Sequence, residues 1–329
     1  MKYTKASRWI VSTVVVALAL PGALSFYANA QSEFLRTDRM PYEAFDKLPK
    51  IDLEVPGSVV HVAFAPGDIA LPREKILDWI KTSAKAVSTY YGHFPVKSVK
   101  LLLVPVDGSR VRGGTTWGYR GAAIRVVLGR DSTEDDLRRD WVMVHEMVHT
   151  ALPDMPERYN WLSEGLAVYV EPIARVQAGD LTAKEIWHAM LRDMPKGMPR
   201  TGDEGLDNTD TWGRKYWGGA MFCLLADVEI RKATSNRFGL QDAMRGVLAA
   251  GGNHEVVWPI ERILATADKA VGVNVLTRLH EEMGPKPVTP ELDGLWRDLG
   301  VIAQGEGVEF DDKASLVAIR ASITSARIK

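Results

Sequence analysis

The distribution of apolar and polar positions divides the chain into a strand-rich first part and a helix-rich second part. Apolar and β-branched residues dominate or alternate over 58–65, 99–106 and 117–128, which predicts strands. One helix is expected among them, over 72–91, where apolar residues recur at helical spacing after Pro72. The further helices that the spacing predicts cover 137–152, 161–174, 181–191, 216–232, 240–250, 257–270 and 274–283. A strand-rich half leading into a helical half indicates an α+β fold.

The same pattern suggests four consecutive segments. They are a signal peptide (1–30), a β-rich N-terminal lobe (31–131), a catalytic helical region (132–250) and a mostly helical C-terminal region (251–329). Within the first lobe, the glycine-rich stretch 113–116 is expected to form a loop. The alternating apolar residues of 316–328 suggest that the chain returns as a final strand.

The amino end has the features of a secretory signal peptide. Residues 1–8 are cationic, residues 9–24 are almost wholly apolar, and Ala28-Asn29-Ala30 forms a small-x-small cleavage site. The alternative is an uncleaved anchor, but the apolar run is interrupted by Pro21-Gly22 and is shorter than the roughly twenty residues that span a bilayer. We therefore expect cleavage after Ala30, an exported protein that is periplasmic or secreted, and no stable membrane insertion afterwards.

Charge and cysteine content limit the possible partners and metal sites. The chain has 41 basic and 42 acidic residues, so a broad basic surface for nucleic acid is not expected. The single cysteine, Cys223, excludes an intrachain disulfide and a cysteine-rich metal cluster, and its apolar surroundings predict a buried helical position. A metal site in this chain would have to be built from histidines and carboxylates.

Such a site is indicated by His145-Glu146-Met147-Val148-His149. Residues four apart lie on one face of a helix, so both imidazoles can reach one ion while Glu146 lies beside its remaining position. The alternative is a pair of surface histidines beside a glutamate. The apolar residues on both sides argue against it, because burying these polar groups without a partner is costly.

Glu164 is the candidate third ligand, and fourteen residues separate it from His149. Hydrolytic zinc sites use three protein ligands and leave a fourth position open. A loop containing Pro153 and Pro156 allows the chain to reverse and bring a second helix against the first. Glu164 could instead be an ordinary solvated residue, and Glu171, two turns later, either supports a ligand or lies on the surface.

These residues resemble a known family. H-E-x-x-H followed by W-L-x-E-G-x-A, with Tyr216-Trp217-Gly218-Gly219 opening a later apolar helix, is similar to the gluzincin zinc metallopeptidases, nearest to the glycyl aminopeptidase and aminopeptidase N families. The resemblance covers about residues 135–250. It implies a thermolysin-like zincin fold, one Zn²⁺ held by His145, His149 and Glu164, and a Tyr216 hydroxyl that stabilises the oxyanion.

The chain also departs from those families. The segment between His149 and Glu164 is shorter, and the Gly-x-Met-Glu-Asn segment that holds a substrate's free amine in aminopeptidase N relatives is absent. The resemblance therefore leaves aminopeptidase and endopeptidase activity both open, as well as the oligomeric state and the role of residues 251–329.

The function expected from these patterns is hydrolysis of a peptide or protein, with Glu146 as the general base. The substrate would pair with the strand at 117–128, where Gly118 and Gly121 would permit close approach. A non-catalytic peptide-binding module and a zinc hydrolase of a non-peptide substrate are the alternatives. Two further expectations are that the acidic segment 203–210 is a solvated turn and that the remaining histidines are ordinary: His61, His93, His188, His254 and His280.

Overall fold

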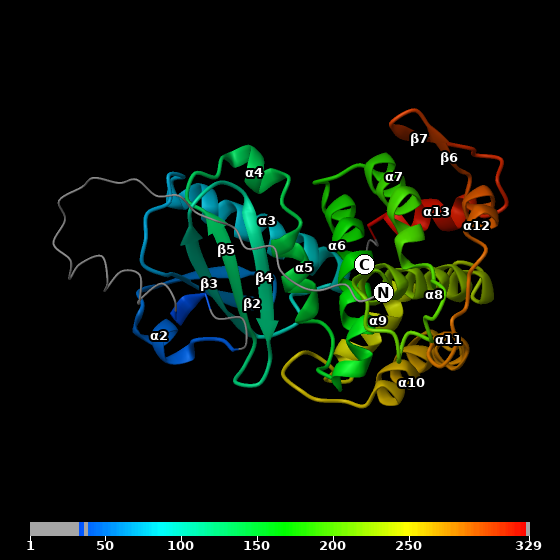
Figure 1. Ribbon diagram of the computed structural model, residues 1–329, viewed down its shortest axis with the longest axis horizontal. Coiled ribbons are helices and arrows are strands. Elements are labelled where there is room, and N and C mark those ends of the chain that lie inside the picture. Colours follow the sequence, from blue (N-terminus) through cyan, green and yellow to red (C-terminus); the bar gives the residue numbers. More distant parts are fainter. Residues whose placement is uncertain (1–32, 36–38, 327–329) are drawn as a thin grey trace.

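The computed structural model describes residues 33–35 and 39–326, and it places a mixed sheet at one end of the molecule and helices at the other (Figure 1). The signal-peptide prediction falls on residues outside this part. The sheet has the order β1-β2-β3-β5-β4, with β2, β3 and β5 parallel and both edge strands antiparallel. Its strands are β1 (Lys50–Val55), β2 (Ser58–Phe64), β3 (Ser98–Val106), β4 (Val111–Trp117) and β5 (Ala123–Gly129). The α+β prediction is confirmed.

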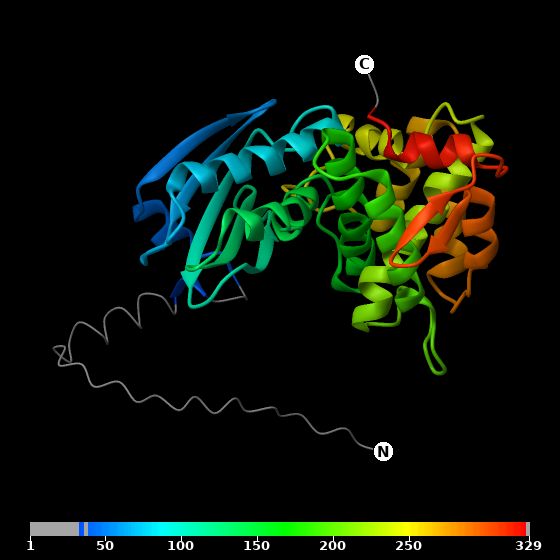
Figure 2. The same cartoon turned by 90° about the horizontal axis from the view of Figure 1, so that it is seen from above.

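The central strands are apolar because the sheet is covered on both faces. On β3, Leu101 and Leu103 face α3 (Arg73–Tyr91), while Leu102 and Val104 face α2 (Tyr42–Lys47), as side-chain alternation requires. The helix α3 connects β2 to its parallel neighbour β3. Figure 2 shows α3 extending from the sheet to the helices, where it packs against α5 (Val142–His149) and α6 (Asn160–Ala178).

Two expectations about the sheet are wrong. Residues 117–128 are not one strand, because the chain turns back between β4 and β5. Residues 113–116, expected as a loop, lie within β4, the edge strand beyond β5. This strand is only half-buried and consists largely of glycine and threonine, so it lacks the apolar alternation that predicts a strand.

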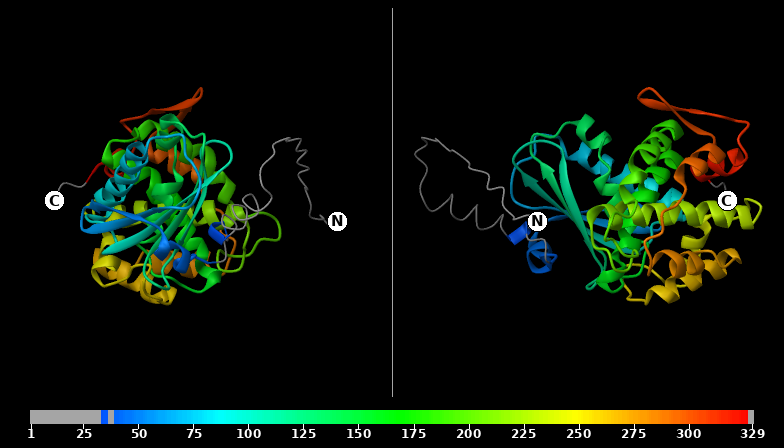
Figure 3. Two further views of the ribbon diagram at one scale, coloured as in Figure 1. Left: turned by 90° about the vertical axis from the view of Figure 1, so that its left-hand side faces the viewer. Right: turned by 45° about the vertical axis from the view of Figure 1, so that its right-hand side comes forward.

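The helical part contains most of the expected helices. Besides α5 and α6, these are α7 (Ala183–Asp193), α8 (Gly219–Ala233), α9 (Leu240–Ala249), α10 (Ile260–Val271) and α11 (Leu276–Met283). The sequence pattern does not predict α12 (Leu292–Leu299) or the hairpin of β6 (Val301–Gln304) and β7 (Gly307–Phe310). This hairpin lies at the outer edge of the helices, away from the sheet (Figure 3). Within the described ranges, no helix is both long and apolar enough to cross a bilayer. Cys223 is buried in α8, as predicted.

Two expected elements at other positions also need correction. The segment 137–152 is divided between α4 (Glu134–Arg138) and α5, because the Asp140 carboxylate accepts hydrogen bonds from the backbone N–H groups of Val142 at 2.9 Å and Met143 at 3.0 Å. It acts as a cap at which α5 begins. The final segment is a helix, α13 (Val317–Thr324), whose buried residues Ile319 and Ile323 are one turn apart.

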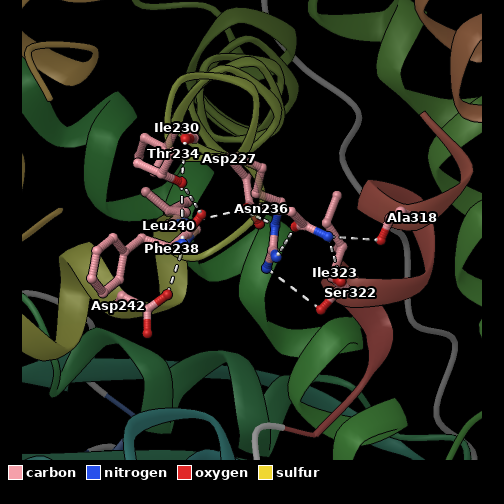
Figure 4. Close-up of polar contacts among 12 residues, drawn as sticks. Asp227, Ile230, Thr234, Asn236, Phe238, Leu240, Asp242, Ala318, Ser322 and Ile323 are labelled. Atoms are coloured by element: carbon pink, nitrogen blue, oxygen red, sulfur yellow. Dashed lines mark hydrogen bonds and ion pairs between the residues drawn. The ribbon is translucent and has the colours of Figure 1, made fainter. Parts of the chain in front are cut away.

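A polar network, buried at Asp227 and Arg231, joins α13 to the rest of the helical part. The Asp227 carboxylate accepts hydrogen bonds from the Leu240 backbone N–H at 3.0 Å and from the Tyr169 hydroxyl of α6 at 3.0 Å. Asn236 donates to the Ala318 carbonyl at 3.2 Å and to the Ser322 hydroxyl at 2.9 Å, both on α13 (Figure 4). Arg231 joins the two groups by donating to Asp227 at 2.7 Å and to Asn236 at 3.0 Å, so residues from α6, α8, α9 and α13 share one set of hydrogen bonds.

Candidate metal centre

Two adjacent helices bring the three predicted metal ligands together. His145 and His149 lie one turn apart on α5, and Glu164 lies on the first half of α6. Their ligand atoms all lie within 4.8 Å of one another, and no other such group of histidines, cysteines and carboxylates occurs in the described part of the chain. Both imidazoles are buried, and Glu164 is partly buried.

The spacing of the ligand atoms fits a zinc ion. Glu164 Oε2 is 3.2 Å from His145 Nε2 and 3.5 Å from His149 Nε2. Two atoms that are each about 2.1 Å from a tetrahedral zinc lie about 3.4 Å apart. The side chains could therefore coordinate one ion with little movement, and a three-ligand set leaves one position open.

The electrostatics of the ligand set favour an ionised Glu164. Burial on its own would raise the pKa of the Glu164 carboxyl, but hydrogen bonds from His145 and His149 outweigh it and hold the pKa well below its usual range. His149 also shares a 2.9 Å hydrogen bond between Nδ1 and the Ser163 hydroxyl, which leaves Nε2 facing Glu164. This bond orients the imidazole from the side opposite Glu164.

Glu146 is held from the sheet side by β4. The Thr116 hydroxyl lies 2.7 Å from Glu146 Oε2 and 2.9 Å from the Glu146 carbonyl oxygen. Two residues earlier, Gly114 leaves room for the same side chain, because a Cβ at this position would lie 2.4 Å from Glu146 Cγ. The edge strand beside the metal helix is therefore β4, and its glycine-rich part accommodates Glu146.

Tyr216 reaches the site through a close helix crossing. It lies in a single π-helical segment, Gly213–Gly218, directly before α8. Where α8 begins, Gly219 contacts α6 so closely that an added Cβ would lie 2.0 Å from the Trp161 carbonyl oxygen. The Tyr216 ring stacks 6.4 Å from the His145 ring, with 13° between their planes. Burial and the carboxylates of Glu164 and Glu146 raise the pKa of Tyr216, so its hydroxyl remains protonated.

These residues line a cavity of about 650 Å³. β4 lines it along its whole length, and His254 closes it near the end of that strand. The backbone N–H of His254 donates to the Thr150 carbonyl at 3.2 Å, and a Cβ on Gly118 would lie 1.6 Å from the His254 carbonyl oxygen. The close approach at Gly118 is thus made by the chain itself, and His254 is a cavity residue that its isolated position in the sequence did not reveal.

Glu171 neither contacts a predicted metal ligand nor lies on the surface. It is buried and pairs with Arg175 at 3.0 Å, and Arg175 also donates to Asp180 at 2.6 Å. Burial raises the pKa of Glu171 to about 7 despite the neighbouring Arg175. Glu171 and Arg175 lie about two and three turns along α6 from Glu164, and Arg175 donates to the Arg138 carbonyl oxygen at the end of α4.

Comparison with known proteins supports a relationship in fold. No protein-family model and no curated protein matches the sequence. Among solved structures, an aminopeptidase N family protein from Idiomarina loihiensis matches with a TM-score of 0.58 at 15% identity, over 78% of this chain and 50% of that chain. A mutant two-domain M1 zinc metallopeptidase bound to L-arginine matches with a TM-score of 0.50 at 15% identity, over 75% of this chain and 53% of that chain.

The fold is similar to that of M1 metallopeptidases. The resemblance to aminopeptidase N relatives stated from the sequence is thereby confirmed for the fold, and the second neighbour is named as a zinc enzyme, the metal predicted for this chain. The chain spans about half the length of these two proteins.

Proposed function

We propose that this protein is an exported zinc metallopeptidase with a thermolysin-like zincin arrangement of its catalytic helices. The observation that carries the proposal is the convergence of His145, His149 and Glu164 at zinc-ligand spacing. Glu146 lies on the same helix as the two histidines and borders the same cavity.

The chain's own residues supply the proton transfers and the oxyanion contact. His145, His149 and Glu164 would hold a zinc ion, which when bound would supply a Lewis acid for the scissile carbonyl and for a water molecule. Glu146 accepts a proton from the attacking water and returns it to the leaving amine. The protonated Tyr216 hydroxyl donates a hydrogen bond to the developing oxyanion, and a donor of this kind typically contributes about 3 kcal/mol.

A peptide substrate would bind along β4. This strand is the last of the sheet, so its outer edge can pair with an extended chain through main-chain hydrogen bonds. β4 also lines the cavity that contains Glu146 and the metal ligands. Such pairing would hold the scissile carbonyl over the metal without requiring a particular side chain.

Substitution of the general base tests the proposal. Glu146→Gln should retain about one zinc per chain and lower peptide cleavage by about 10²–10⁴-fold, the range for loss of general base catalysis. Glu164→Gln should lose zinc as well. Glu157→Gln, a change at an exposed position of the connecting segment, serves as the matched control and should behave as the parent.

Zinc content is measured by metal analysis, and cleavage by mass spectrometry on a mixed peptide library. A Glu146→Gln variant as active as the parent would refute the peptidase mechanism. Peptide affinity without turnover in the parent would favour the binding module instead. Export is tested separately by the mass of the mature amino terminus, which we expect at Gln31.

A further inference from the structure

The acidic segment 203–210, expected as a solvated turn, is buried in its middle and attached to the C-terminal region. Leu206 is 2% exposed. Its backbone N–H donates at 2.9 Å to the carbonyl oxygen of Met283, the last residue of α11, and the backbone N–H of Asp207 donates to the carbonyl oxygen of Gly284 at 3.0 Å. Leu206 and Asp207 are therefore fixed on the end of α11.

The Asp207 carboxylate holds two aromatic rings. The indole N–H of Trp161, on α6, donates to Oδ1 at 2.9 Å, and His280 Nε2, on α11, lies 2.9 Å from Oδ2. The two rings stack on each other with 6.1 Å between their centroids. A Cβ at Gly284 would lie 2.8 Å from Asp207 Oδ2, so glycine leaves room for this arrangement. One carboxylate thus joins α6 to α11.

Asp207 and its neighbour Leu206 contact both elements that carry residues of the proposed site. Trp161, the partner of Asp207, lies in the first turn of α6, three residues before Glu164. Leu206 packs on the end of the π-helical segment that contains Tyr216, since a Cβ at Gly218 would lie 3.0 Å from Leu206 Cδ2. The positions of the third metal ligand and of the oxyanion donor therefore depend on the same two residues.

The hydrogen bond from Trp161 links Asp207 to the metal ligand. The Trp161 side chain is buried, so its N–H needs an acceptor, and the Asp207 carboxylate supplies one. Without the carboxylate, the indole would keep an unpaired donor in a buried position, which is costly unless the first turn of α6 moves. Because Trp161 and Glu164 lie three residues apart on one helix, such a movement displaces the Glu164 carboxylate as well.

We propose that Asp207 is a positioning residue for the metal centre, through which α11 holds Glu164 and Tyr216 in their relative places. The part of this inference that concerns catalysis rests on the proposed function. It also gives a role beyond packing to the C-terminal region 251–329, which the sequence left without one.

Zinc affinity tests the link to Glu164. Asp207→Ala, and Trp161→Phe, which keeps an aromatic ring but lacks the donor, should each raise the zinc Kd about tenfold in competition with a chelator, the lower end of the range for residues that orient metal ligands. The double variant should bind zinc no more weakly than Asp207→Ala, because both changes remove the same hydrogen bond. Asp207→Asn should retain most of the affinity, since its side-chain oxygen can still accept from the indole.

Kinetics with saturating zinc test the link to Tyr216. The kcat of Asp207→Ala should fall about tenfold while KM stays within about twofold of the parent value, as expected when a group that acts in the transition state is displaced. Asp207→Asn should again restore most of kcat. A loss of stability alone would not divide kcat from KM in this way.

Arg278→Ala is the matched control. Arg278 also lies on α11, and its ion pair with Glu229 joins this helix to α8 at a different place from Asp207. This variant should keep the zinc Kd and the kcat of the parent, whatever its free energy of unfolding in urea. If Asp207→Ala likewise loses only stability and keeps both values, the inference is overturned.

The zinc measurement separates this inference from the proposed function. If the parent cleaves no peptide, the peptidase function fails, while the zinc Kd values still decide whether Asp207 positions the metal centre. Equal zinc Kd values for the parent, Asp207→Ala and Trp161→Phe would refute it.

Discussion

The hydroxyl of Thr116 donates a hydrogen bond to the carboxylate of Glu146, with 2.7 Å between Oγ1 and Oε2. The two residues lie on different elements, β4 and α5. A hydrogen bond to a charged acceptor is stronger than one between neutral groups. The edge strand thus orients the proposed general base.

Replacing Thr116 with Val should slow the chemical step while leaving binding intact. The change removes the donor but keeps the side-chain shape, so the Glu146 carboxylate loses one of its positioning contacts. We expect kcat to fall about tenfold to a hundredfold, the equivalent of one hydrogen bond to a charged group, with KM and zinc content unchanged.

Thr116→Ser provides the control, because it retains a hydroxyl and should restore most of kcat. A structural role alone would affect both variants through the free energy of unfolding, which urea denaturation measures. An unchanged kcat in Thr116→Val would contradict the positioning role.

Gly219→Ala should displace α8 from α6. The new Cβ would lie 2.0 Å from the Trp161 carbonyl oxygen, so the helices must separate. Overpacking of this kind lowers the free energy of unfolding by about 1–3 kcal/mol. Because the crossing also positions Tyr216 relative to Glu164, kcat should fall together with stability.

Gly307→Ala on β7 is the comparison, since its Cβ would meet its nearest neighbour, the Gln304 carbonyl oxygen, at 3.8 Å. Denaturation curves and kinetics of both variants test this prediction. Equal stability of the two variants would show that the α6–α8 contact tolerates a methyl group.

Glu171 should make the stability of the chain depend on pH. Its folded-state pKa of about 7 lies above the usual glutamate value of 4.5, so the folded chain binds this proton more tightly than the unfolded chain does. The contribution of this proton to the free energy of unfolding is fully present below the unfolded-state pKa of Glu171 and is lost as the pH rises through about 7.

The measurement compares the parent with Glu171→Gln, which cannot titrate. The free energy of unfolding of the parent minus that of the variant should fall by up to about 3 kcal/mol between about pH 5 and pH 8. Taking the difference removes the opposite contributions of carboxylates with lowered pKa, such as Asp193. A difference that stays constant or rises over this range would show that Glu171 is not protonated in the folded chain.

The parts of the metal centre that could be predicted from the sequence are those set by local geometry. One helical turn separates His145 from His149, so any helix there brings them together. Glu164 could be predicted as the third ligand because hydrolytic zinc sites use three protein ligands and because a short proline-containing loop joins its helix to that of the histidines. The role of Tyr216 was predicted only from the family resemblance. Its ring approaches His145 because α8 and α6 cross closely at Gly219, and the sequence does not indicate that crossing.

Long-range contacts account for what the sequence did not indicate. Thr116 and Glu146 are thirty residues apart, and nothing in the sequence around either residue indicates that the two form a hydrogen bond. In β4, glycine stands at position 114 because a larger residue there would clash with Glu146. The helix α13 was mistaken for a strand because Val317 and Ile319 alternate with polar or small residues over too few positions to distinguish the two periods.

The docking of α13 supports α6, the helix that carries Glu164. The Gln177 side chain, near the end of α6, donates to the Ile323 carbonyl oxygen at 3.2 Å, and the buried Arg231 side chain contacts the Ser322 carbonyl oxygen at 3.4 Å. The two contacts join residues that are 146 and 91 positions apart in the sequence. Synthesis of α5 and α6 is therefore not sufficient for the final support of α6, which also requires that the chain has been made through α13.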